Sequence, residues 1–107
     1  MNALDPKSTA VLVVDVQVGV FDTHPAPLDK DEVLERINAV TRAGRLARGP
    51  IIFLQHDGDA DGQWLRPFTD DWKLHPSLEV GRDDRVVRKT ACDGFYRTEL
   101  EGCFISE

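Results

Sequence analysis

The sequence has few cysteines and no long apolar run, and both absences narrow the class of protein. Only two of its 107 residues are cysteines, Cys92 and Cys103, which provide neither a disulfide framework nor a metal-ligand spacing. No apolar run approaches the roughly 20 residues of a membrane span. The N-terminal MNALDPKSTA lacks the apolar core of a signal peptide. These features predict a cytoplasmic protein without a membrane partner.

Basic side chains are also in the minority. Lys and Arg total 13 against 19 Asp and Glu, which gives a net charge of -6 and a pI near 5.0. Because no basic stripe interrupts this acidic excess, we expect no nucleic-acid partner. Hydrophobic residues make up 41% of the chain and charged residues 30%, as in an ordinary globular protein. The length predicts one domain over residues 1–107.

The chain does contain a run of buried-strand residues near its start. AVLVVDVQ, residues 10–17, has five Val or Leu among its eight residues. Such a run predicts a central parallel strand, buried on both faces, over about Val11 to Asp15. Asp15 and Gln17 stand at its carboxyl end, where open α/β sheets bind their ligands. Asp15 is therefore a candidate site residue, and the alternative is a structural carboxylate that caps the strand or binds a neighbouring loop.

A helix and a second strand follow in order. Turn residues predict a loop over residues 19–27, after which Asp29 and Glu32 form a capping-box-like pair at a helix start. An apolar stripe at helical spacing follows, and a Gly-Pro pair ends it. The next buried strand covers about Ile51 to Gln55. This pattern predicts an α/β fold of the three-layer α/β/α type with a parallel, Rossmann-like sheet.

Two further polar side chains follow later strands. His56 leaves the second strand, and Lys89 ends a short third strand predicted over about Arg85 to Arg88. The connection between them, residues 57–85, is long enough to be functional or poorly ordered. Because the carboxyl ends of parallel strands meet at one edge, we expect Asp15, His56 and Lys89 to converge there. We expect Asp15 and Lys89 to lie within direct or water-bridged reach, and a solvated strand-end lysine is the alternative.

The C-terminal segment contains the start of a helix without its body. Thr98 and Glu101 form a second capping-box pattern, yet Gly102 follows at once. A helix this short is marginal without packing. Three strands with one full helix also leave one face of a parallel sheet bare. We therefore expect the fold to be incomplete at its C-terminal end.

Three segments, VLVVDVQVGVFD, IIFLQHD and VVRKTACDGFYRTELE, occur in this order from about Thr9 to Glu101. Together they resemble the isochorismatase-like cysteine hydrolases. The resemblance implies the fold of that family and thiol-dependent hydrolysis of a small amide or vinyl-ether-type substrate, and we expect no cofactor. We also expect no metal, because His56, Asp57 and His75 do not reproduce the pattern of Asp and His ligands in the nicotinamidases. The resemblance further implies an Asp-Lys-Cys triad in which Asp15 is the base for the thiol and Lys89 stabilises the thiolate and the intermediate.

The same resemblance suggests which residues contact the substrate. It points to substrate-binding positions at Gln17, Phe21 and Phe95, and His56 joins them because it follows a strand at the same edge. Core packing is the alternative for the two phenylalanines. A different class of function is a non-catalytic α/β module that binds a small molecule or a partner at this edge. We also expect a homo-oligomer.

The nucleophilic cysteine implied by the resemblance has no counterpart in the sequence. It is expected at the start of a helix after a fourth parallel strand, well beyond Lys89. We interpret Cys92, three residues after Lys89, as structural. The run from Gly102 to Glu107 resembles the stretch before the nucleophile in a shortened member, and an unrelated tail after a truncation is the alternative. On either interpretation we expect the 107-residue chain alone to lack hydrolase activity.

Overall fold

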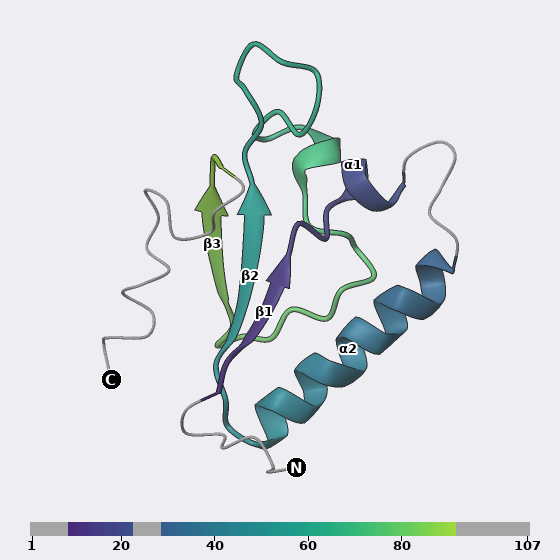
Figure 1. Cartoon of the computed structure of the whole chain (residues 1–107), viewed down its shortest axis with the longest axis vertical. Coiled ribbons are helices and arrows are strands. Elements are labelled where there is room, and N and C mark those ends of the chain that lie inside the picture. The colour runs from purple at the N-terminus through teal and green to yellow at the C-terminus, as the bar shows by residue number, and fades with distance from the viewer. Residues whose placement is uncertain (1–8, 23–28, 92–107) are drawn as a thin grey trace.

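The structure is a computed structural model, which describes residues 9–22 and 29–91. Its parallel sheet has the order β1-β2-β3, with the strands β1 (Val11–Val14), β2 (Ile51–His56) and β3 (Arg85–Lys89). Its helices are α1 (Val18–Phe21), α2 (Lys30–Leu46) and the 3-10 helix η1 (Asp70–Trp72). Helix α2 runs beside the sheet, while α1 and η1 lie near the carboxyl ends of the strands (Figure 1). The predicted parallel α/β sheet is confirmed, and the helix predicted after Thr98 falls outside the described residues.

Strand β2, and not β1, is the buried centre of the described sheet. Residues 51–55 of β2 are all buried, whereas Leu12 and Val14 of β1 are 39% and 48% exposed. Within the described ranges β1 pairs with β2 alone, from Val11 opposite Ile51 to Val14 opposite Leu54. The prediction of a first strand buried on both faces is therefore wrong for this part of the chain. β-branched residues suit edge and central strands alike, so composition did not place the strand within the sheet.

Alternating side chains of β2 contribute to a core on each face of the sheet. Phe53, which is fully buried, packs in the cluster that contains Leu34 of α2. On the other face Ile52 and Leu54 form a second cluster with Val87 of β3. Burial of a side chain as large as phenylalanine stabilises a fold by about 2–3 kcal/mol. The second cluster joins β2 to β3, and the pairing of these two strands places His56 opposite Lys89.

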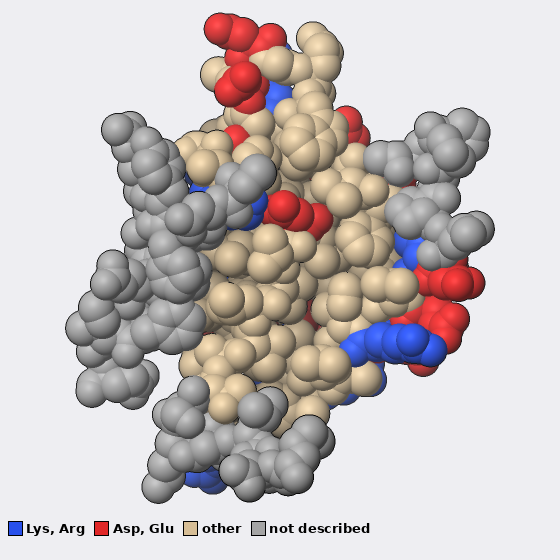
Figure 2. All heavy atoms as spheres, viewed as in Figure 1, with Lys and Arg blue, Asp and Glu red and all other residues tan. Residues whose placement is uncertain are grey.

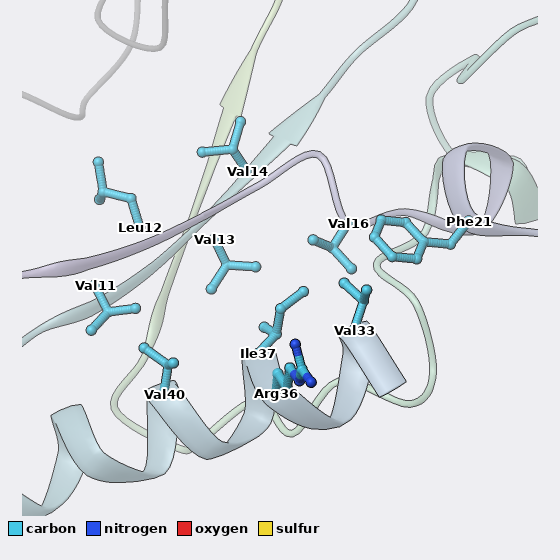
Figure 3. Close-up of a pocket in the computed structure, with 10 residues that line it drawn as sticks. All are labelled: Val11, Leu12, Val13, Val14, Val16, Phe21, Val33, Arg36, Ile37 and Val40. Carbon is cyan, nitrogen blue, oxygen red and sulfur yellow. The ribbon is translucent and has the colours of Figure 1, made fainter. Parts of the chain in front are cut away.

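An open apolar groove of about 470 Å³ lies between β1 and α2, beside the edge of β1 that has no partner strand among the described residues. Figure 3 shows the alternation along β1, in which Val11 and Val13 point toward the helix and Leu12 and Val14 point away from it. Nine of the ten lining residues are apolar, and Arg36 is the tenth. Charged side chains are sparse over the middle of the face shown in Figure 2.

The N-terminal segments of the helices differ from expectation in two respects. Val18–Phe21 forms one helical turn, where the turn residues predicted a loop. Asp29 does occupy the N-cap of α2, but its φ is 57° and its side chain makes no capping hydrogen bond. The predicted capping box is therefore wrong, because a capping side chain needs an extended backbone and Asp29 is left-handed. Glu32 instead accepts a hydrogen bond from Arg36, one turn further on, at 2.6 Å.

The C-terminal end of α2 is tied to the segment that leads into β3. Arg45 Nη2 lies 2.5 Å from Asp84 Oδ2, and the Gly81 N–H donates to the same oxygen at 2.6 Å. Burial raises the pKa of Asp84, but the hydrogen bonds from Arg45 and Gly81 outweigh burial and hold this pKa below its ordinary value of 3.8. The folded chain thus keeps Asp84 ionised under acidic conditions in which the unfolded chain protonates it.

This contact predicts a specific loss of stability in acid. Because the pKa of Asp84 is lower in the folded chain, its contribution is fully present above about pH 3.8 and disappears as the pH falls through the folded pKa. We expect Asp84→Asn to remove this part of the pH dependence. Urea unfolding of the parent and the variant across the acidic range measures it, with Asp83→Asn as the matched control. If Asp84→Asn left the slope of the unfolding free energy against pH unchanged in acid, Asp84 would not be the source of this pH dependence.

Candidate active site

Asp15 and Lys89 form a charge contact at the carboxyl edge of the sheet. Lys89 Nζ lies 3.0 Å from Asp15 Oδ1, and the exposed fractions of the two side chains are 2% and 38%. Asp15 Oδ1 is itself buried and accepts no well-oriented hydrogen bond in residues 9–22 and 29–91. The contact is therefore ionic rather than a directed hydrogen bond. A buried ammonium is paired with a carboxylate that remains partly open to solvent.

A backbone turn carries the Asp15 carboxylate to this edge. The φ of Asp15 is 59°, a left-handed conformation that costs a non-glycine residue of order 1 kcal/mol or more. The Asp15 N–H still donates to Leu54 O at 3.0 Å, so pairing with β2 continues up to the turn. The turn ends β1 at Val14, one residue before the predicted boundary. Strain of this kind persists where the surrounding structure holds the residue in place.

His56 and the end of β3 complete the surroundings of the ammonium. Lys89 Nζ lies 3.3 Å from His56 Nδ1 and 3.2 Å from the carbonyl oxygen of Ala91. The predicted convergence of Asp15, His56 and Lys89 at one edge is thus confirmed. The alternative of a solvated strand-end lysine is excluded, because the Lys89 side chain is 2% exposed.

Gln17 lies beneath this edge and is fully buried. Its Nε2 donates to His56 O at 3.0 Å and to Trp72 O at 2.7 Å, and its Oε1 accepts the His56 N–H at 2.9 Å. Both amide N–H groups and one oxygen lone pair are therefore used by backbone groups. Substrate contact by Gln17 stays a prediction that these hydrogen bonds do not favour.

Aromatic and charged side chains fix the long connection over the ends of the strands. Trp72 Nε1 donates to Asp57 Oδ1 at 2.7 Å, and Arg88 Nη2 lies 2.9 Å from Asp57 Oδ2. The Arg88 guanidinium stacks over the rings of Phe68 and Trp72, 5.0 and 5.2 Å from their centroids. These contacts were not predicted from the sequence, although the connection contains two tryptophans, Trp64 and Trp72, whose large side chains require packing partners.

The remaining predicted substrate-binding residues differ in what surrounds them. The half-buried ring of His56 lies beside Trp64, with 5.8 Å between centroids, and Trp64 is 57% exposed. Phe21 packs against the core cluster and lies edge-on to His75 at 6.3 Å, which favours core packing over substrate contact. Phe95 lies outside the described residues, as do both cysteines.

His75 anchors a second polar cluster, which the sequence analysis did not identify. The side chain is 6% exposed, its Nδ1 accepts the Ser77 N–H at 3.1 Å, and its Nε2 lies 3.0 Å from Asp22 Oδ1. Hydrogen bonds from Lys30 and then His75 hold the pKa of Asp22 below its ordinary value. The cluster connects α1, α2 and the segment before β3.

The described residues contain neither a metal-binding cluster nor a membrane-spanning helix. No group of three or more His, Cys, Asp or Glu residues in ranges 9–22 and 29–91 is placed to hold a metal ion. Over the same residues, no helix is both long and apolar enough to cross a membrane.

Comparison with known proteins identifies the family to which this chain belongs. The Isochorismatase domain matches residues 9–105, and the chain belongs to the isochorismatase family. Among curated relatives, a streptothricin hydrolase of Streptomyces noursei is 41% identical over 91 residues, which cover 85% of this chain and 36% of the relative.

Solved structures share the fold of this chain. The crystal structure of an isochorismatase family protein matches with a TM-score of 0.79 and 29% identity, over 91% of this chain and 56% of that one. A cysteine hydrolase from Pseudomonas syringae pv. phaseolicola 1448A matches with a TM-score of 0.82 and 24% identity, over 96% of this chain and 56% of that one. The chain thus spans about a third of the curated streptothricin hydrolase and just over half of these two structures.

Proposed function

We propose that this protein is a thiol-dependent hydrolase of a small amide or vinyl-ether-type substrate, with Asp15 as base and Lys89 as the cation that stabilises the thiolate and the intermediate. The observation that carries the proposal is the 3.0 Å contact between the buried Lys89 ammonium and the half-exposed Asp15 carboxylate. Family membership and the 41% identity to a streptothricin hydrolase support it.

The proposed chemistry requires both charges. A cysteine thiol with an ordinary pKa of about 8.5 is mostly protonated at neutral pH, so it needs a base and a nearby cation. Asp15 takes the thiol proton, and the sulfur attacks the amide carbonyl carbon. Lys89 offsets the negative charge of the thiolate and of the tetrahedral intermediate. The nucleophilic cysteine lies outside the described residues, none of which is a cysteine.

The intermediate then resolves in two steps. The amide C–N bond breaks as its nitrogen takes the proton from Asp15, which leaves the acyl group on sulfur as a thioester. Asp15 next accepts a proton from an attacking water, and the C–S bond breaks to release the carboxylic acid. The sulfur recovers the proton from Asp15, so the enzyme returns to its starting state.

Activity measurements separate this proposal from the non-catalytic alternative. We expect the protein expressed from its complete natural reading frame to hydrolyse members of a panel of small amides that includes streptothricin, with isochorismate as the vinyl-ether test. Asp15→Asn and Lys89→Met are each expected to lower kcat/KM about 10²–10⁴-fold. Lys73→Met is the matched control, since Lys73 is an exposed lysine paired with Asp70.

Two outcomes would contradict the proposed roles. A protein that binds panel compounds without turning them over is the non-catalytic module instead. Turnover that survives Asp15→Asn removes Asp15 from the mechanism. Cys92→Ser is included because turnover that depends on Cys92 makes that residue the nucleophile.

We also propose a homo-oligomer that associates through the face of the sheet opposite α2. Leu12 and Val14 of β1 expose large apolar side chains on this face, and an exposed apolar surface favours association. We expect Val14→Lys to shift sedimentation velocity profiles toward the monomer. Val80→Lys is the matched control, because Val80 is 46% exposed in a loop. Equal profiles for the two variants would contradict this interface.

The cytoplasmic location and the lack of a nucleic-acid partner remain predictions.

A further inference from the structure

His56 connects the buried lysine to the accessible surface of the site. We propose that His56 is a positioning residue for Lys89, whose neutral imidazole accepts an N–H of the ammonium at Nδ1 and holds the ammonium beside Asp15. The two nitrogens are 3.3 Å apart. The catalytic consequence rests on the proposed function of Lys89, but the contact is independent of it and can be tested in the 107-residue chain.

Two of the three neighbours of the Lys89 ammonium accept hydrogen bonds from it, and the third is an ionic partner. An ammonium carries three N–H groups and no acceptor. One N–H is directed to Ala91 O at 3.2 Å and one to His56 Nδ1, while Asp15 Oδ1 lies 3.0 Å from the ammonium as an ionic partner without a well-oriented hydrogen bond. Because the lysine can only donate, His56 Nδ1 must be unprotonated, and the neutral ring carries its proton on Nε2.

Loss of the His56 Nδ1 acceptor would change the position of the Lys89 ammonium. Without His56, one N–H of an ammonium on a side chain that is 2% exposed has no partner. An unsatisfied buried donor is costly, so the ammonium would move toward water or toward another carbonyl. Either movement lengthens the contact with Asp15. The imidazole thus acts on the reaction through Lys89, not by touching the substrate.

His56 is itself held on two sides. The Gln17 amide accepts the His56 N–H at 2.9 Å and donates to His56 O at 3.0 Å, as a neighbouring strand does. Trp64 lies against the imidazole ring at a tilt of 41°. With its backbone and one side of its ring both in contact, the imidazole has little freedom to turn away from Lys89. The fully buried Gln17 side chain therefore serves to hold the backbone of His56 in place.

Nitrogen NMR of the 107-residue chain tests the contact. We expect His56 to be protonated on Nε2, its Nδ1 resonance to move in Lys89→Met, and the Lys89 Nζ resonance to move in His56→Leu. His75→Asn is the matched control, because His75 is also buried but contacts Asp22 and Ser77 instead. It should leave the Lys89 resonance in place. If Lys89→Met fails to fold, the change in the Lys89 Nζ resonance caused by His56→Leu is by itself sufficient to test the contact.

A ring protonated on Nδ1, or a Lys89 resonance indifferent to His56→Leu, would overturn the proposal. Kinetics then test the consequence in protein expressed from the complete natural reading frame. We expect His56→Leu to lower kcat roughly 10- to 100-fold with little change in KM. We expect His56→Asn, whose amide oxygen lies near the position of Nδ1, to retain kcat within about threefold of the parent. Equal losses in both variants would refute the positioning role.

The NMR and the kinetic experiments distinguish failure of this inference from failure of the proposed function. A parent that turns over no amide of the panel contradicts the proposed function, and the NMR result still stands or falls by itself. An active parent whose Lys89 resonance ignores His56→Leu contradicts the role of His56 and leaves the proposed function intact.

Discussion

Asp15→Asn is expected to destabilise the chain by about 3–5 kcal/mol, more than removal of its partner does. The variant leaves the Lys89 ammonium, on a side chain 2% exposed, without its counter-ion. Lys89→Met instead leaves a carboxylate on a side chain 38% exposed, which water reaches, and we expect a cost of about 1–2 kcal/mol. The double variant removes both charges and should recover most of the loss, because no uncompensated ion remains. Urea unfolding of the parent, the two single variants and the double variant gives the coupling free energy of the double-mutant cycle.

The exposed pair between Lys73 and Asp70 is the matched control for this cycle. Its atoms are 2.9 Å apart, but the side chains are 62% and 92% exposed, so its coupling should lie within about 0–1 kcal/mol. A double variant of Asp15 and Lys89 that is less stable than either single variant would contradict the interpretation. It would mean that the two side chains stabilise the fold independently.

The second large effect is expected from Gln17→Leu, at about 2–4 kcal/mol. This change leaves the N–H and the carbonyl of His56 without the partners that Gln17 supplies. Gln55→Leu is the matched comparison, because Gln55 is 6% exposed and donates to Trp72 O, an oxygen that also accepts from Gln17. We expect Gln55→Leu to cost about 1 kcal/mol. Equal losses in chemical unfolding would show that burial, and not the pairing with His56, determines the stability.

The geometry of the edge could be predicted because it follows from strand polarity. Asp15, His56 and Lys89 each follow a parallel strand, and the carboxyl ends of such strands meet. The place of β1 within the sheet could not be predicted, since its β-branched run fits an edge as well as a centre. The helical turn at Val18–Phe21 was missed because four residues are too few to show a periodicity.

The contacts around the edge were harder to predict than the edge itself. Residues 57–84 have no periodic pattern, and their path depends on contacts with distant residues, such as Asp57 with both Trp72 and Arg88. The contacts of Gln17 could not be predicted from the sequence either. Strand spacing predicted that it would lie on the same side as Asp15, but not that backbone groups of His56 and Trp72 would occupy its amide.

The two tryptophans near the site are in different surroundings, and this difference gives the protein an optical signal of its own. Trp64 is 57% exposed and lies beside His56, whereas Trp72 is half-buried, donates to Asp57 and lies under Arg88. Water-exposed indole emits at longer wavelengths than indole in apolar contact. A ligand that binds beside Lys89 and covers Trp64 displaces water from this indole and shifts its emission to the blue, while Trp72 keeps its spectrum. Occupancy beside Lys89 can therefore be followed by intrinsic fluorescence, without a label and without turnover.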